Sequence, residues 1–84
     1  MVSQMERYEV IVSLKEGVVD PEGDNTRKAL NLLGFASVTG VRYSRRYIIE
    51  VEGTGNESDV EEMCRRLLAN PAIQKYAIKK AGND

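Results

Sequence analysis

The fold is decided by residues 8–23, which read YEVIVSLKEGVVDPEG. Apolar and polar side chains alternate along residues 6–14, which predicts a strand with one buried face. The next three residues, Lys15-Glu16-Gly17, are typical of a turn. Asp20-Pro21 is typical of a helix start, because Asp caps the first N–H groups and Pro has no N–H to leave unpaired.

The predicted helix continues to Gly34, where a C-terminal cap favours positive φ and hence glycine. Its expected apolar face holds Thr26, Ala29, Leu30 and Leu33. Gly23 stands in the first turn, where glycine costs up to ~1 kcal/mol relative to alanine. We therefore expect another backbone segment to approach the helix closely at Gly23.

Residues 38–52 predict a hairpin, because apolar and polar residues alternate on both sides of its centre. A three-residue loop at residues 44–46 would pair Tyr43 with Tyr47. Only a loop of odd length gives these two strands one apolar face, since cross-strand partners share a face. This register places both tyrosines under the helices.

A second helix is expected to begin at Ser58, which forms a capping box with Glu61. Its apolar residues recur at helical spacing and are Val60, Met63, Cys64, Leu67 and Leu68. Asn70-Pro71 is expected to end this helix, and residues 73–80 predict a last strand with Tyr76 and Ile78 on its inner face.

The expected order is therefore β-α-β-β-α-β. Each helix and strand has one apolar face, so the elements predict an α+β fold, a two-layer sandwich with an antiparallel sheet in the ferredoxin-like arrangement. Residues 1–84 are expected to form a single domain. This fold hosts many unrelated functions and selects none of them.

Composition excludes several kinds of site. Twelve basic and thirteen acidic residues give a net charge of −1, whereas dedicated nucleic-acid binders carry a surplus of Lys and Arg. Without histidine, Ser-His-Asp catalysis and His-ligated metal sites are excluded. The single cysteine, Cys64, cannot form an internal disulfide and is expected in the core. No catalytic, cofactor-binding or metal-binding residue is predicted.

Targeting signals and membrane spans are not found in the sequence. Residues 1–7 carry both charge signs, no apolar run follows, and no stretch has the ~20 apolar residues of a span. The expected location is the cytoplasm. Asp20, Glu22 and Asp24 resemble a calcium loop only superficially, and a solvated helix start explains them.

Two surface features predict contacts with other proteins. Arg42, Arg45 and Arg46 form the one local basic cluster, which is interpreted as a protein contact or a solvated hairpin tip. An RNA-binding sheet is the weaker alternative, since the RNP1 pattern is missing. Ile11 and Ile48 fall on the outer face of the sheet among charged residues, which favours self-association or a partner.

The chain resembles PurS, the family of small subunits of phosphoribosylformylglycinamidine synthase. The resemblance rests on residues 12–23 (VSLKEGVVDPEG), residues 29–35 (ALNLLGF), Val41-Arg42 and residues 63–73 (MCRRLLANPAI) with Tyr76. It spans residues 8 to about 80. Two loops depart from the family pattern, at residues 53–57 and at Arg45-Arg46.

The resemblance implies a non-catalytic subunit that joins a glutaminase subunit to a large synthetase subunit and assists ammonia transfer between them. The whole assembly is a ligase that amidates phosphoribosylformylglycinamide in purine biosynthesis, and it uses glutamine and ATP. No cofactor is expected on this chain, while ATP and Mg belong to the synthetase subunit. The family also implies a homodimer or homotetramer.

Candidate partner-contact residues follow from the same segments. They are Lys15, Asp20, Pro21, Gly23, Arg42, Asn70 and Pro71. Each can also be explained as a turn, a cap or a helix end, and for Pro21 and Asn70-Pro71 that explanation is at least as good. A regulatory module that binds a small ligand of the amino-acid-sensing kind, near residues 17–23, is the alternative function.

Overall fold

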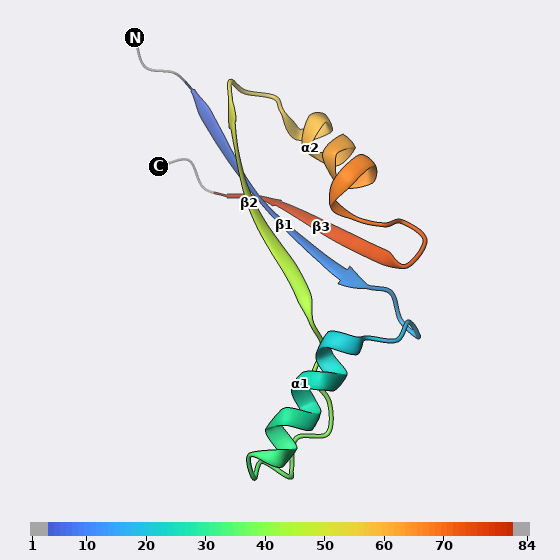
Figure 1. Cartoon of the computed structure of the whole chain (residues 1–84). Helices are drawn as coiled ribbons and strands as arrows, with labels where there is room; N and C mark the ends of the chain where they lie inside the picture. Colours follow the sequence, from blue (N-terminus) through green and yellow to red (C-terminus); the bar gives the residue numbers. More distant parts are fainter. Residues whose placement is uncertain (1–3, 82–84) are drawn as a thin grey trace.

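The computed structural model describes residues 4–81 and contains three strands and two helical segments (Figure 1). In chain order these are β1 (Met5–Leu14), α1 (Pro21–Leu32), β2 (Ser44–Glu52), α2 (Glu57–Met63) continued by the π-helical turn η1 (Cys64–Leu68), and β3 (Gln74–Lys80). No helix among residues 4–81 is long and apolar enough to cross a membrane.

The three strands form one antiparallel sheet in the order β2-β1-β3. The central strand β1 pairs with both others, so that Val10 lies opposite Tyr47 on β2 and Ile78 on β3. Cross-strand partners share a face. The even-numbered residues of β1 therefore face α2, and the odd-numbered residues face away from it.

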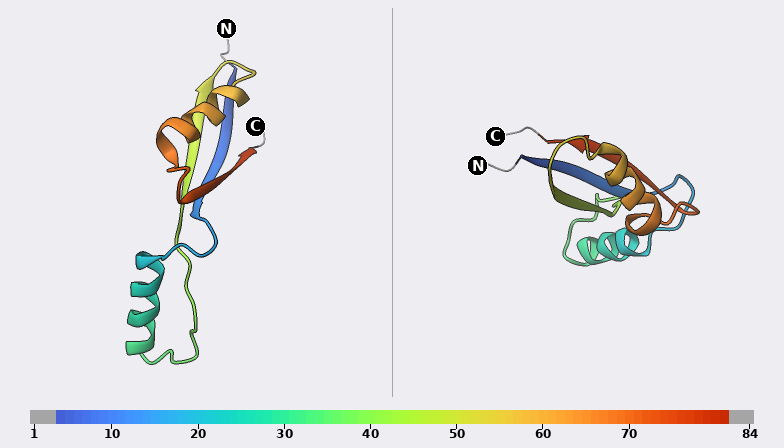
Figure 2. Two further views of the ribbon diagram at one scale, coloured as in Figure 1. Left: turned by 90° about the vertical axis from the view of Figure 1, so that its right-hand side faces the viewer. Right: turned by 90° about the horizontal axis from the view of Figure 1, so that it is seen from above.

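The core lies between α2 and the sheet (Figure 2). Tyr8, Val10 and Val12 of β1 are fully buried against Val60 and Cys64. Fully burying a valine side chain contributes about 1.5–3 kcal/mol, and with so few buried residues the core is small.

Helix α1 does not pack on the sheet. Together with residues 33–43, which run back along it, α1 forms an arm that extends from one end of the sheet (Figure 1). The chain measures 56 × 29 × 14 Å, with a radius of gyration of 16.9 Å. A compact chain of this length has about 12 Å. The predicted apolar face of α1 is therefore uncovered, and Leu33 is 74% exposed.

The α+β class and the antiparallel sheet are confirmed, but the predicted hairpin over residues 38–52 is wrong. Residues 44–46 begin β2 instead of forming a loop, and residues 38–43 belong to no strand. Tyr47 packs on the core as predicted, whereas Tyr43 is exposed. The physical reason is that the backbone before β2 is bound to α1, as described below, and so does not reach the sheet.

Both ends of α1 are confirmed: Asp20 caps it, and Gly34 follows it with a φ of 105°. The start of α2 is corrected, because Asn56 occupies the N-cap position and Ser58 lies inside the helix. Leu67 is also corrected, since it is 82% exposed instead of buried.

The π-helical turn explains Leu67. The N–H of Ala69 donates to the carbonyl of Cys64 at 2.9 Å, five residues back, so the turn holds one residue more than an α-helical turn. The α-helical spacing that would place Leu67 over the sheet is broken at this point, while Leu68 packs against the core.

Candidate contact site

Asp20 ties the start of α1 to Tyr43 at the base of the arm. One carboxylate oxygen accepts the N–H of Gly23 at 2.9 Å and so caps α1, and the other accepts the N–H of Tyr43 at 2.8 Å. These backbone donors, Tyr43 first, lower the pKa of the Asp20 carboxyl below its usual value. A single side chain therefore fixes the start of α1 against the chain entering β2.

Gly23 is the point of closest approach in this junction. It is buried, and a Cβ atom built on it would lie 2.1 Å from the carbonyl oxygen of Val41. Side chains essentially never come so close to a backbone atom, so only glycine fits. The close approach expected from the sequence is confirmed, with Val41 as the neighbouring residue.

Lys15, Asn70 and Pro71 lie at the same end of the sheet. The N–H of Lys15 donates to the carbonyl of Ile73 at 2.9 Å, which ties the turn after β1 to the turn before β3. The Asn70 side chain accepts the N–H of Ala72 at 3.1 Å, and the Asn70 carbonyl accepts the N–H of Gln74 at 2.7 Å. Asn70-Pro71 therefore builds an exposed, well-connected turn.

The seven candidate residues thus gather where β1 ends and where β2 and β3 begin. A groove of about 390 Å³ runs through this region, with Asp20, Pro21 and Gln74 among its lining residues. Pro21 and Arg42 are both exposed. Both Asp20 oxygens accept backbone N–H groups, so this carboxylate has a structural role in the junction.

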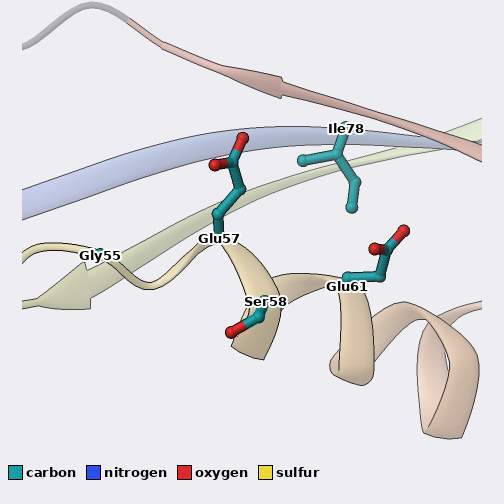
Figure 3. A pocket seen from close by; sticks show the side chains of 5 residues that line it. All are labelled: Gly55, Glu57, Ser58, Glu61 and Ile78. Carbon is teal, nitrogen blue, oxygen red and sulfur yellow. The ribbon is translucent and has the colours of Figure 1, made fainter.

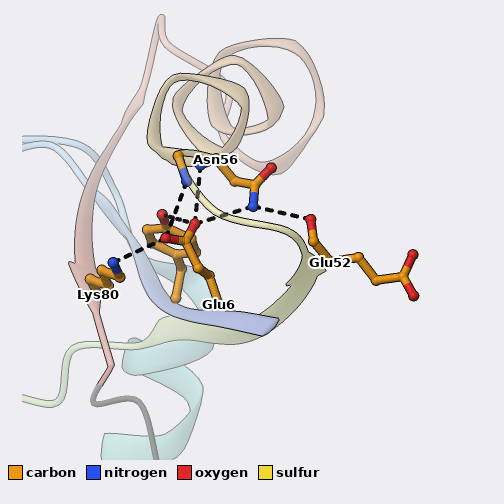
Figure 4. A network of polar contacts seen from close by, with 6 residues as sticks. Glu6, Glu52, Asn56 and Lys80 are labelled. Carbon is orange, nitrogen blue, oxygen red and sulfur yellow. Dashed lines mark hydrogen bonds and ion pairs between the residues drawn. The ribbon is translucent and has the colours of Figure 1, made fainter. Parts of the chain in front are cut away.

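Glu6 is a buried carboxylate that sequence reasoning missed (Figure 4). It accepts the hydroxyl of Tyr8 at 2.8 Å and the N–H groups of Asn56 and Gly55 at 3.0 and 3.2 Å, and it pairs with Lys80 at 3.0 Å. The backbone N–H of Asn56 does most to lower the pKa of Glu6, which falls to about 2.

The Glu6 network holds the loop before α2 against the sheet. Burial and the neighbouring Glu6 carboxylate together raise the pKa of Tyr8 to about 12. The sequence did carry one signal for this network. Glu6 is even-numbered like Tyr8 and Val10, and alternate residues of a strand share a face, so Glu6 falls on the buried face of β1.

A larger pocket, of about 560 Å³, lies between the start of α2 and β3. Glu57, Glu61 and Ile78 point into it, whereas the hydroxyl of Ser58 points away (Figure 3). Cys64 lies in the core, where burial raises the pKa of its thiol and keeps it in the unreactive protonated form. Across residues 4–81, no group of three or more His, Cys, Asp or Glu residues is placed to hold a metal ion.

Comparison with known proteins finds relatives that all belong to one family. Residues 7–82 match the PurS family, described as phosphoribosylformylglycinamidine (FGAM) synthase. The chain is 49% identical over 73 residues to the phosphoribosylformylglycinamidine synthase subunit PurS of Archaeoglobus fulgidus, covering 83% of this chain and 91% of that protein.

Solved structures agree with this result. The chain is similar to Methanocaldococcus jannaschii PurS, one of the subunits of formylglycinamide ribonucleotide amidotransferase, with a TM-score of 0.82 and 40% identity over 94% of this chain and 99% of that one. It is also similar to Bacillus subtilis PurS, with a TM-score of 0.83 and 33% identity over 92% and 99% of the two chains.

Proposed function

Since the chain belongs to the PurS family of phosphoribosylformylglycinamidine synthase subunits, which serve purine biosynthesis, we propose that it connects a glutaminase subunit to a large synthetase subunit. In this role the chain makes and breaks no covalent bond. It positions the two larger subunits so that ammonia released by one reaches the other. ATP and Mg are used by the synthetase subunit, and the assembly works in the cytoplasm.

The observation that carries this proposal is the uncovered arm. Leu32, Leu33 and Phe35 are 88%, 74% and 57% exposed. Large apolar side chains exposed next to one another typically mark a surface that binds another protein. The arm is nevertheless well ordered internally, because the Asn31 amide donates to the carbonyls of Phe35 and Val38 at 2.9 and 3.2 Å. Such a preformed apolar surface is suited to binding protein.

The arm also supports self-association. Its helix is amphipathic and is not covered by the sheet within residues 4–81, and a second copy offers the same apolar stripe. We propose a homodimer or homotetramer formed through the arm.

Reconstitution tests the connecting role. The synthetase and glutaminase subunits of the same organism are combined with and without this chain, and glutamine-dependent synthesis is compared with synthesis from added ammonium. We expect the chain to raise the glutamine-dependent rate strongly and to leave the ammonium-dependent rate of the synthetase nearly unchanged. Equal glutamine-dependent rates with and without the chain would eliminate the proposal.

A further inference from the structure

The face of the sheet opposite α2 is left open by the described chain. Where all three strands pair, it consists of three cross-strand rows centred on Glu9, Ile11 and Ser13. We call these nine outward residues the open face. Its main side chains are Glu9, Ile11, Arg46, Ile48, Lys75 and Lys79, and serine or alanine fills the rest.

The centre of the open face is apolar. Ile11 and Ile48 lie on neighbouring strands, two residues out of register, and are 37% and 44% exposed. At this diagonal spacing long side chains on one face reach one another. The apolar centre is small, so it can contribute to a contact but cannot by itself hold a stable complex.

The charge around this centre is positive. Arg46 forms an ion pair with Glu9, the one carboxylate of the open face. The Lys75 and Lys79 side chains on β3 are thereby left in excess. The helical layer on the other side of the sheet is acidic, with Glu57, Asp59, Glu61 and Glu62 against Arg65 and Arg66. The open face therefore carries two positive charges in excess. Beyond it on the same side of the sheet, Arg7 and Glu50 form an ion pair and Glu52 adds one negative charge, so this side stays weakly positive while the helical layer is negative.

We propose that the open face docks on an acidic surface with an apolar centre, carried by one of the larger subunits. This inference rests on the connecting role proposed above and assigns one surface to it. The apolar arm remains available for the contacts proposed above, including a second copy, and the charged sheet face serves this larger partner. The lysines supply attraction at a distance, and the isoleucines supply contact area.

Charge also argues against a second copy on the open face. Two open faces stacked on each other bring like charges together, which is unfavourable. Docking of the open face on the acidic helical layer of another copy is a head-to-tail contact, which continues into a filament unless its rotation closes a ring.

The test measures association with the synthetase and glutaminase subunits at low and high salt. In the double variant Lys75→Glu/Lys79→Glu we expect the association rate at low salt to fall about tenfold and to lose most of its salt dependence. A matched control, Lys28→Glu/Arg66→Glu, makes the same change in net charge at exposed positions away from the open face and is expected to associate like wild type.

A further variant separates binding from folding. Lys79 lies opposite Glu9, so Lys75→Gln/Lys79→Gln avoids the new repulsion and is expected to show an intermediate loss with unchanged circular dichroism. An unchanged association rate, an equal loss in the control pair, or a loss of self-association alone would overturn the docking face. If wild type itself failed to associate, the connecting role would fall as well, whereas these other outcomes would leave it standing.

Discussion

Glu6 is the one charged residue buried among residues 4–81, and its position sets how the loop before α2 is held. Every donor around it favours the ionised carboxylate, which explains a pKa of about 2 against an ordinary 4.5. A protonated Glu6 has no charge to pair with Lys80, and its O–H is a donor among groups that are themselves donors. Folding stability must therefore depend on the charge of this residue.

We expect the free energy of unfolding to fall as the pH is lowered from about 4.5 to about 2, the window between the unfolded and folded pKa values of Glu6. The sign follows because a depressed folded pKa means that the unfolded state binds the proton first. Asp20, whose pKa is also lowered, adds to the fall.

Urea unfolding across this pH range measures the effect. The Glu6→Gln variant should be less stable at neutral pH and should show a flatter acid limb than wild type. Glu50→Gln, an exposed carboxylate on the opposite face, serves as the control and should keep the wild-type slope. An identical slope in Glu6→Gln and wild type would contradict the assignment.

At the scale of elements, the junction between α1 and residues 41–43 holds the arm in its direction. The carbonyl of Val41 rests against Gly23, and the N–H of Tyr43 binds Asp20. The backbone groups that a hairpin would use are therefore engaged by a helix start. The same segment forms neither a strand nor a free loop.

Gly23→Ala should destabilise this junction. The added methyl group meets backbone, which cannot rotate away, and overpacking of this kind costs about 1–3 kcal/mol. Gly40→Ala is the control, because a Cβ at Gly40 meets nothing within 4 Å. Hydrogen exchange of the α1 amides, combined with thermal unfolding, measures both variants. Equal hydrogen-exchange protection of the α1 amides in both variants would show that the carbonyl of Val41 does not exclude a side chain at position 23.

Strand β1 and both ends of α1 were predictable from sequence, because alternation in β1 and the Asp-Pro and Gly34 signals are local. The close approach at Gly23 was predictable because glycine in a first helical turn needs a reason. Two features were not predictable. Residues 41–43 alternate like a strand although their partner is a helix start. Leu67 keeps α-helical spacing although a π-helical turn moves it outward.

At the scale of the whole molecule, an extended shape accompanies an incomplete core. The radius of gyration of 16.9 Å exceeds the ~12 Å of a compact chain of this length because the arm projects beyond the sheet. The candidate contact residues were predicted individually from a family resemblance. Their gathering at one end of the sheet depends on the antiparallel order β2-β1-β3, which local patterns do not specify.

Self-association through the arm predicts that the melting temperature rises with protein concentration. Leu33→Ser should lower the molar mass measured by light scattering toward that of the 9.4 kDa chain and should abolish this dependence. Lys28→Ser, on the same helix but away from its apolar stripe, is the control and should keep the wild-type mass. A monomeric wild type at all concentrations would contradict the proposed oligomer.

The central place of β1 also determines when the chain can fold. Tyr8 pairs with Ile49 on one side and with Lys80 on the other. The pairing of β1 with β3 therefore cannot form until β3 has been synthesised. Pairing over such sequence separations slows folding, because a long loop must close before the contact forms. The three-stranded sheet is therefore completed only with the synthesis of β3, about 60 residues after β1.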